Sequence, residues 1–126
     1  MIKMKLTRNF SLDEFACKDG TPVPGVYFDN VLELALNLQV VRGALRKPIN
    51  INSAYRTEKH NKSVGGSKNS QHLTAKASDI RSNNKTPQEI YNLIERLILE
   101  GKVKEGGLGL YKTFVHYDIR GTKARW

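Results

Sequence analysis

The sequence predicts an α+β domain in which two longer helices flank a small antiparallel sheet. Two segments carry apolar residues at three- and four-residue spacing, which is typical of helices with one buried face. Four shorter segments are apolar or alternate apolar with polar residues, which is typical of strands. A length of 126 residues suits one domain with a modest core. We therefore expect residues 1–126 to form a single unit.

The N-terminal part of the chain is expected to be helical at two places. Ser11 followed three residues later by Glu14 forms a capping box, which predicts a short helix that ends before Gly20. The longer helix is expected over residues 29–46, and Pro48 would end it. Its apolar stripe consists of Val31, Leu34, Leu38, Val41 and Leu45.

The middle of the chain is expected to supply two strands separated by a helical turn. Ile49 and Ile51 alternate with asparagines, as in a short strand. Residues 57–64 are expected to form a helical turn that a pair of glycines stops. A second strand is expected over residues 75–81.

The C-terminal part predicts a second long helix and a hairpin. Thr86 at the cap, a proline at the first helical position and Glu89 mark the start of the helix, and Gly101 would end it. Its apolar stripe consists of Ile90, Leu93, Ile94, Leu97 and Ile98. Residues 108–111 and 114–120 then predict two strands joined by a tight turn.

The composition is strongly basic. The formal net charge is +9 and the isoelectric point is about 9.8, which favours a polyanionic partner through long-range attraction. Nucleic acid, the anionic bacterial wall and a merely solvated basic surface all fit this charge. The chain has a single cysteine, so no intrachain disulfide can form.

The N-terminal segment does not resemble a secretory signal. MIKMKLTRNF is basic but lacks a long apolar run. No stretch of the chain approaches the roughly 20 apolar residues that a membrane span requires. We expect a protein that is synthesised in the cytoplasm and has no membrane span.

Two of the three histidines have neighbours that suit a metal site. Asp79 follows His72 by seven residues, and two imidazoles with one carboxylate would leave a fourth zinc position for water. Strand alternation places on one face Phe114, His116, Asp118 and Arg120. The spacing of His72 and Asp79 also fits coincidence or a hydrogen-bonded core pair. Asp118 and Arg120 also fit a cross-strand ion pair.

Six short motifs occur in order along most of the chain. They are SAYR (53–56), NKSVGG (61–66), SQH (70–72), ASDI (77–80), GLGLY (107–111) and FVHYDIR (114–120). The opening FSLDEFAC (10–17) and the closing ARW (124–126) fit the same set. In this combination the chain resembles the zinc D-Ala-D-Ala carboxypeptidase-like peptidase family, in the branch common in phage lysins and phage-derived wall hydrolases.

The resemblance implies a hedgehog/DD-peptidase-like fold and one zinc ion per chain. It implies that the metal ligands are His72, Asp79 and His116. It also implies that Arg56 contacts a substrate carbonyl or carboxylate, for which the planar guanidinium is suited. Ser70 would lie beside the substrate in a supporting role. The alternative for Arg56 is a surface salt bridge.

Two positions depart from the family pattern. Ala75 stands three residues after the first histidine of the site, where glycine is usual. Alanine is a mild change there unless the backbone requires a positive φ. Thr113 stands where many relatives have the catalytic acid, three residues before the last histidine, and it cannot act as a carboxylate base.

The missing acid makes other residues candidates for the general base. Asp118 lies two residues from the last zinc-binding histidine, roughly 6–7 Å along a strand, so it could act as the base or could instead orient that ligand. Glu105, in the loop before a glycine pair, is a third possibility. His60 is expected to be exposed on its helical turn and not to bind metal.

The implied function is zinc-dependent hydrolysis of amide bonds in peptidoglycan stem peptides, by a DD-carboxypeptidase or an endopeptidase. The enzyme would act on the wall as a monomer, after release from the cell or as part of a virion. Thr113 keeps open a zinc-containing module that binds peptidoglycan without cleaving it. A nucleic-acid-binding protein lacks support beyond charge, because no recognition helix or aromatic stacking pattern is present. Trp126 could pack onto the domain or lie in a free basic tail.

Overall fold

The computed structural model describes residues 4–126, so the first three residues of the basic N-terminal segment lie outside it. The α-helices are α1 (Phe28–Leu45), α2 (Glu58–Ser63) and α3 (Pro87–Leu99). The strands are β1 (Asn50–Ser53), β2 (Ala77–Arg81), β3 (Gly107–Leu110), β4 (Val115–Asp118) and β5 (Ala124–Arg125). Short 3-10 turns are η1 (Leu12–Phe15), η2 (Gly25–Tyr27) and η3 (Gln71–Thr74).

The strands form one sheet in the order β1-β2-β4-β3-β5. The pairs β1–β2, β2–β4 and β3–β4 are antiparallel, whereas β5 pairs with β3 in parallel. The predicted α+β class is confirmed. The parallel pairing of β5 was not predicted, because a strand of two residues leaves no alternating pattern in the sequence.

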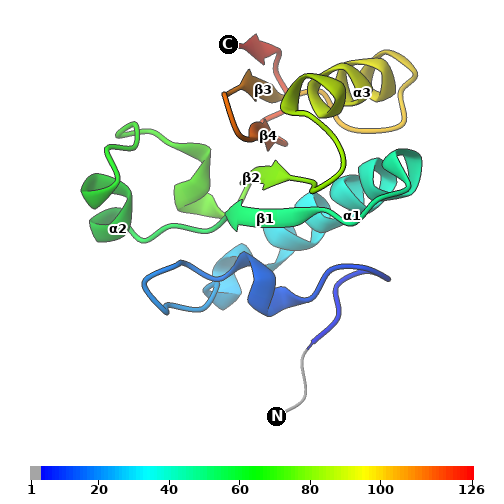
Figure 1. The fold of residues 1–126 in the computed structure, drawn as a ribbon. Coiled ribbons are helices and arrows are strands. Elements are labelled where there is room, and N and C mark those ends of the chain that lie inside the picture. Colours follow the sequence, from blue (N-terminus) through cyan, green and yellow to red (C-terminus); the bar gives the residue numbers. More distant parts are fainter. Residues whose placement is uncertain (1–3) are drawn as a thin grey trace.

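The two long helices contact each other and cover the sheet with their predicted apolar stripes. In Figure 1, α1 lies behind β1, and α3 lies beside β3 and β4. All five stripe residues of α1 are buried, as are Ile90, Ile94 and Leu97 of α3. Full burial of such a side chain contributes about 1.5–3 kcal/mol. The helices therefore cover one face of the sheet and leave polar residues of its strands outside the helix-covered core.

The capping box predicted at Ser11 forms, and the cap predicted at Thr86 is a second capping box. In the second, the Glu89 amide donates to the Thr86 hydroxyl at 3.1 Å, and the Thr86 amide donates to the Glu89 carboxylate at 3.0 Å. These bonds satisfy backbone donors that a helix start would otherwise leave unpaired. They begin α3 at the residue that the sequence indicated.

Ala75 explains why the second strand begins later than predicted. Its φ is +61°, in the left-handed region, where it ends η3. A left-handed backbone costs an L-residue other than glycine roughly 1–2 kcal/mol. The condition under which alanine is not a mild replacement for glycine is therefore met. Regular strand geometry starts only at Ala77.

The C-terminal residues pack onto the sheet and do not form a free tail. The Trp126 amide donates to the Leu108 carbonyl at 3.2 Å, and the Leu110 amide donates to the Trp126 carbonyl at 2.8 Å. Figure 1 shows this end of the chain beside β3. These two bonds fix the position of Trp126 beside β3.

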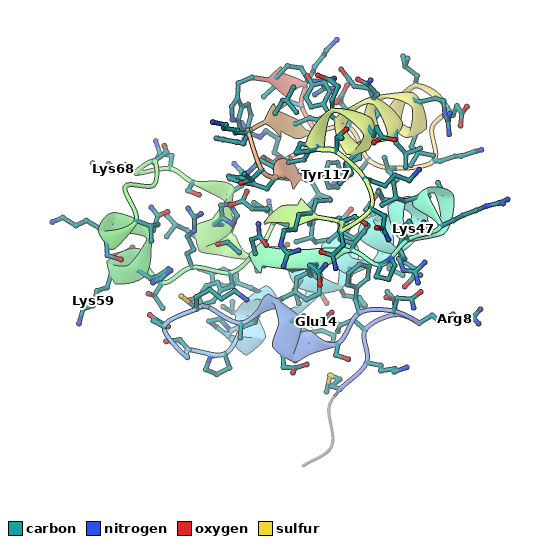
Figure 2. All side chains as sticks on the ribbon, viewed as in Figure 1. Arg8, Glu14, Lys47, Lys59, Lys68 and Tyr117 are labelled. Carbon is teal, nitrogen blue, oxygen red and sulfur yellow. The ribbon has the colours of Figure 1, made fainter. Side chains whose placement is uncertain are left out.

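Basic side chains surround this core. In Figure 2, Arg8, Lys47, Lys59 and Lys68 point away from the ribbon, whereas Tyr117 lies inside it. Across residues 4–126, no helix has the length and apolar character needed to cross a bilayer. The positive charge is thus spread over the outside of the domain, including the part around α2.

Candidate active site

The floor of the site is built by two adjacent strands and one 3-10 turn. Asp79 on β2 lies directly opposite His116 on β4 in the antiparallel register. The turn η3 brings His72 to the same place, and one donor atom from each of the three residues lies within 4.8 Å of the others. All three side chains are buried. The structure therefore brings together the three residues that the sequence predicted.

His72 is held from both its ring and its backbone. Its Nδ1 lies 2.6 Å from the Ala54 carbonyl, its amide donates to the Ser70 hydroxyl at 3.1 Å, and its carbonyl accepts from the Arg56 amide at 2.9 Å. A carbonyl only accepts, so Nδ1 carries the hydrogen. In the neutral ring, the lone pair of Nε2 then faces a carboxylate oxygen of Asp79 at 3.4 Å. Two facing acceptors call for a cation between them.

His116 lies between two carboxylates. Its Nδ1 is 3.2 Å from an oxygen of Asp79, and its Nε2 is 2.7 Å from an oxygen of Asp118. Asp118 is fully buried and also accepts from the Gly107 amide at 2.9 Å and from the Arg120 guanidinium at 2.8 and 2.9 Å. Asp118 and Arg120 therefore pair along one segment, not across two strands.

These contacts shift the protonation equilibria of the floor. Burial opposes the charged form of Asp79, but the adjacent imidazoles of His116 and His72 outweigh it and lower the pKa of that carboxyl. Burial likewise opposes charge on Asp118, yet bonds from His116 and Arg120 lower its pKa. Burial opposes the imidazolium of His116, but bonds to Asp118 and Asp79 raise its pKa. The site thus keeps both carboxylates in the charged form, which is the form in which Asp79 can bind a metal.

The donor set fits a zinc ion. Two imidazole nitrogens and a carboxylate are ordinary zinc ligands, and three protein ligands leave one position open, as catalytic zinc sites do. Ligands about 2.0–2.1 Å from a tetrahedral zinc are separated by roughly 3.3 Å. The nitrogen–oxygen separations are close to that value, 3.4 Å from His72 to one Asp79 oxygen and 3.2 Å from His116 to the other, so a small turn of the carboxylate would bring one oxygen toward both imidazoles.

The floor opens into a cavity of about 580 Å³. Arg56 forms part of its polar side, and its guanidinium donates to Ser53 at 3.1 Å, Asn61 at 3.2 Å and Asp79 at 3.3 Å. The Arg56 side chain is only 15% exposed, so this is not the surface salt bridge considered from the sequence. Ser70 also lines the cavity, where its hydroxyl caps η3.

Three aromatic residues also line the cavity. The rings of Tyr111 and Phe114 stack with centroids 4.4 Å apart. The Trp126 indole donates to the Tyr111 hydroxyl at 2.7 Å, and its ring centroid lies 4.9 Å from that of His116. Gly109 lies beneath the indole, where an added Cβ would meet the ring. We refer to Tyr111, Phe114 and Trp126 as the aromatic wall.

Sequence reasoning did not assign these aromatic residues to the site. Tyr111, Phe114 and Trp126 belong to motifs of the resemblance, but Trp126 was expected either to pack onto the domain or to lie in a free basic tail. The available signal was the pair of aromatic positions flanking the predicted hairpin turn. The long-range contact with the last residue has no counterpart in local spacing.

The other positions considered from the sequence, Glu105, Thr113 and His60, do not line the cavity. Glu105 pairs with Arg125 at 2.8 Å and does not line the cavity. Thr113 is exposed in the turn before β4 and is also absent from the lining. His60 is half-buried on α2, where it lies near Cys17 and not on an open surface as expected.

The buried set of two imidazoles and one carboxylate suits a metallopeptidase. A family model described as Peptidase M15 matches residues 8–118. The chain belongs to this family, which confirms the resemblance drawn from the motifs. No curated protein gave a match to the chain.

Proposed function

We propose that the protein hydrolyses amide bonds in peptidoglycan stem peptides with one zinc ion held by His72, Asp79 and His116. The observation that carries this proposal is the buried cluster of two imidazoles and a carboxylate at the floor of an open cavity. Zinc bound there would supply Lewis-acid activation of a water and of the scissile carbonyl. The surrounding residues bind and orient the substrate.

Arg56 is suited to hold a substrate carbonyl or carboxylate. A guanidinium has five N–H donors, and contacts within residues 4–126 use one each on Nε and the two terminal nitrogens. One donor on each terminal nitrogen is left for a ligand in the cavity. Such preorganised donors stabilise negative charge that develops on a carbonyl oxygen. The bond to Asp79 fixes the guanidinium beside the floor.

Tyr111 adds a second donor on the other side. Its oxygen accepts the indole N–H of Trp126, so its own hydroxyl hydrogen can be donated to a group in the cavity. Ser70 supports the substrate side by capping η3. The aromatic wall would cover the apolar part of a stem peptide, while the cationic side would hold its carboxylate.

The contacts of Asp118 favour orientation of His116 over direct proton transfer. Its carboxylate is fully buried and bound to the imidazole, a backbone amide and Arg120. A carboxylate on the outer nitrogen of a ligating histidine fixes the ring and raises its basicity. Asp118→Asn separates the two roles predicted for this residue. Loss of zinc affinity supports orientation, whereas loss of turnover with unchanged zinc affinity supports the base.

The proposal covers both a DD-carboxypeptidase and an endopeptidase of the phage type. Such an enzyme, made in the cytoplasm, would reach the wall after release from the cell or as part of a virion and would act as a monomer. Its positive charge would favour the anionic wall. Purified stem peptides with and without the terminal D-Ala-D-Ala distinguish the two bond specificities.

A binding module without hydrolysis is the second candidate. Among the described residues that line the cavity, Asp79 is the one carboxylate, and it is assigned to the metal. Thr113, at the usual acid position, lies outside the cavity. Such a module would bind purified wall without releasing new amino groups.

The test combines metal content with hydrolysis. Elemental analysis of the wild type and of His116→Ala is paired with release of amino groups from purified peptidoglycan. We expect zinc and hydrolysis in the wild type, and loss of the floor zinc and of hydrolysis in the variant. Zinc without hydrolysis would support the binding module. A wild type that binds no zinc would overturn the assignment of the floor ligands.

A further inference from the structure

A second group of metal-binding side chains lies outside the cavity. One donor atom each from Cys17, Asp19 and His60 lies within 4.8 Å of the others. None of the three lines the cavity described above. We refer to these three residues as the turn cluster.

The N-terminal half of the turn cluster is fixed by a tight turn. The Cys17 amide donates to the Thr21 carbonyl at 2.8 Å, and the Gly20 amide donates to the Cys17 carbonyl at 3.0 Å. Gly20 has a φ of +99°, which favours glycine. The Thr21 amide also donates to the Asp19 carboxylate at 2.9 Å. Backbone geometry therefore holds the thiol and the carboxylate on one turn.

Thr57 joins this turn to the start of α2. Its hydroxyl donates to the second carboxylate oxygen of Asp19 at 2.9 Å and accepts from the His60 amide at 3.1 Å. His60 thus stands in the first turn of α2 directly against the 17–21 turn. Within residues 4–126, its imidazole has no hydrogen-bond or ion-pair partner, so both ring nitrogens are available to a ligand.

The donor types select a metal class. A thiolate, an imidazole and a carboxylate are all zinc ligands, whereas calcium and magnesium take oxygen ligands. The chain holds no second cysteine, so Cys17 has no disulfide partner within it. Its side chain is only 3% exposed and stands away from the cavity, which argues against a nucleophile that attacks the same substrate.

We propose that Cys17, Asp19 and His60 bind a second divalent cation of the zinc class, with water completing the coordination. Tetrahedral sulfur, nitrogen and oxygen ligands are separated by roughly 3.3–3.6 Å, so the present spacings, which lie within 4.8 Å, must close by at most about 1.5 Å. The His60 ring has no hydrogen-bond partner within residues 4–126, so its rotation can bring it toward the thiol and toward Asp19, whose carboxylate is held by Thr21 and Thr57. The assignment does not depend on the proposed hydrolysis.

The position of this cation indicates a structural role. It would link the 17–21 turn to α2, which follows Arg56 and leads into the segment from Val64 to Gln71 that lines the cavity. Binding would therefore stabilise one side of the cavity without touching a substrate. The ion would act as a cross-link in place of a disulfide.

Cobalt(II) binding tests the proposal, because only a thiolate ligand gives an intense sulfur-to-cobalt charge-transfer band in the near ultraviolet. Cys17 is the sole cysteine, and the floor site has nitrogen and oxygen donors only. The full chain, reduced and metal-free, is titrated with Co²⁺ alone. We expect about two equivalents to bind, together with the charge-transfer band.

Three variants assign the band. Cys17→Ala removes the band and one equivalent, and His60→Ala weakens binding of the same equivalent. His116→Ala is the control, because it keeps the band while the floor equivalent is lost. Circular dichroism confirms that each variant is folded. A wild type without the band, or Cys17→Ala that still binds two equivalents, would overturn the proposal whatever the outcome of the hydrolysis assay.

Discussion

The two clusters have the same number of donors but very different supports. The floor cluster of His72, Asp79 and His116 stands on adjacent strands and η3, and both imidazoles are braced at the nitrogen that faces away from Asp79. The turn cluster stands on a tight turn and a helix of six residues, and its imidazole has no brace among the described residues. A braced set is ready for a metal that performs chemistry. An unbraced set is ordered by its metal, which suits a structural ion.

This difference predicts different linkage to stability. Ligands that are already in place gain metal affinity without further ordering, whereas a set that must close spends part of its binding free energy on ordering. A metal that binds only the folded state still stabilises it in proportion to the logarithm of its concentration over Kd. The floor metal should therefore be the tighter one, and the turn metal the more easily removed.

The largest expected effect comes from replacing one histidine of each cluster by alanine. His72→Ala should reduce hydrolysis by about 1,000-fold or more, because the Lewis acid is lost. His60→Ala should retain most of the hydrolysis but lower the melting temperature in the presence of zinc. Amino-group release and thermal unfolding, measured on both variants, check this. Equal loss of hydrolysis in both variants would contradict the division of roles.

Removing the brace of the floor cluster should have the next largest effect. Asp118→Asn should weaken floor zinc affinity by about 10–100-fold, because partners of a ligating histidine typically contribute that much. Competition with a chromogenic chelator measures the affinity. Glu105→Gln is the matched control, since that carboxylate pairs with Arg125 away from the site. An unchanged affinity in Asp118→Asn would favour the general-base role.

Replacing the Arg56 guanidinium beside the floor cluster should have a moderate effect. Arg56→Lys keeps the charge but loses the planar arrangement of donors that holds Ser53, Asn61 and Asp79. We expect kcat/KM to fall by about 10–100-fold, which is roughly 1.4–2.7 kcal/mol. Steady-state kinetics on a stem peptide measure this. Arg81→Lys, at the end of β2 and outside the cavity lining, should leave the kinetics unchanged.

Stepwise chelation should separate the two metals by affinity. Low chelator concentrations should remove the turn metal and lower the melting temperature by a few degrees, roughly as expected for 1 kcal/mol in a domain of this size. Hydrolysis should persist until higher concentrations remove the floor metal. Loss of activity before any loss of stability would reverse the proposed order.

The smallest expected effect concerns the link between two floor residues. Ala75 lies between His72 and Asp79 with a φ of +61°. Ala75→Gly should raise the free energy of unfolding by about 0.5–1 kcal/mol, because relief of the left-handed strain exceeds the entropy cost of glycine. Denaturant unfolding measures this. Ala44→Gly, within α1, should instead destabilise the protein.

The sequence predicted those features that have a local pattern. The helices followed from apolar stripes, and the capping boxes followed from side chains three residues apart. The three floor residues were predicted to bind a metal from motif resemblance and from strand alternation around His116. The pairing of β2 with β4, which are separated in the chain by α3 and β3, then places Asp79 opposite His116.

The features that sequence reasoning missed depend on contacts between distant segments. The Ala54 carbonyl that orients His72 has no side-chain signature, because every residue carries a carbonyl. The aromatic wall forms because Trp126 lies beside β3. The strand β5 that places it there has only two residues, too few for a recognisable strand pattern in the sequence. His60 was expected on the surface because nothing near it in sequence suggested its approach to Cys17.

Gly107 affects the position of His116 although it has no side chain. An added Cβ there would meet the Asp118 carboxylate, which its amide also binds. Any larger residue would push that carboxylate away and turn the imidazole with it. In a full substitution scan scored by activity, position 107 should therefore be as intolerant as a metal ligand. Selection for metal binding would thus also constrain Gly107, which does not contact the metal site.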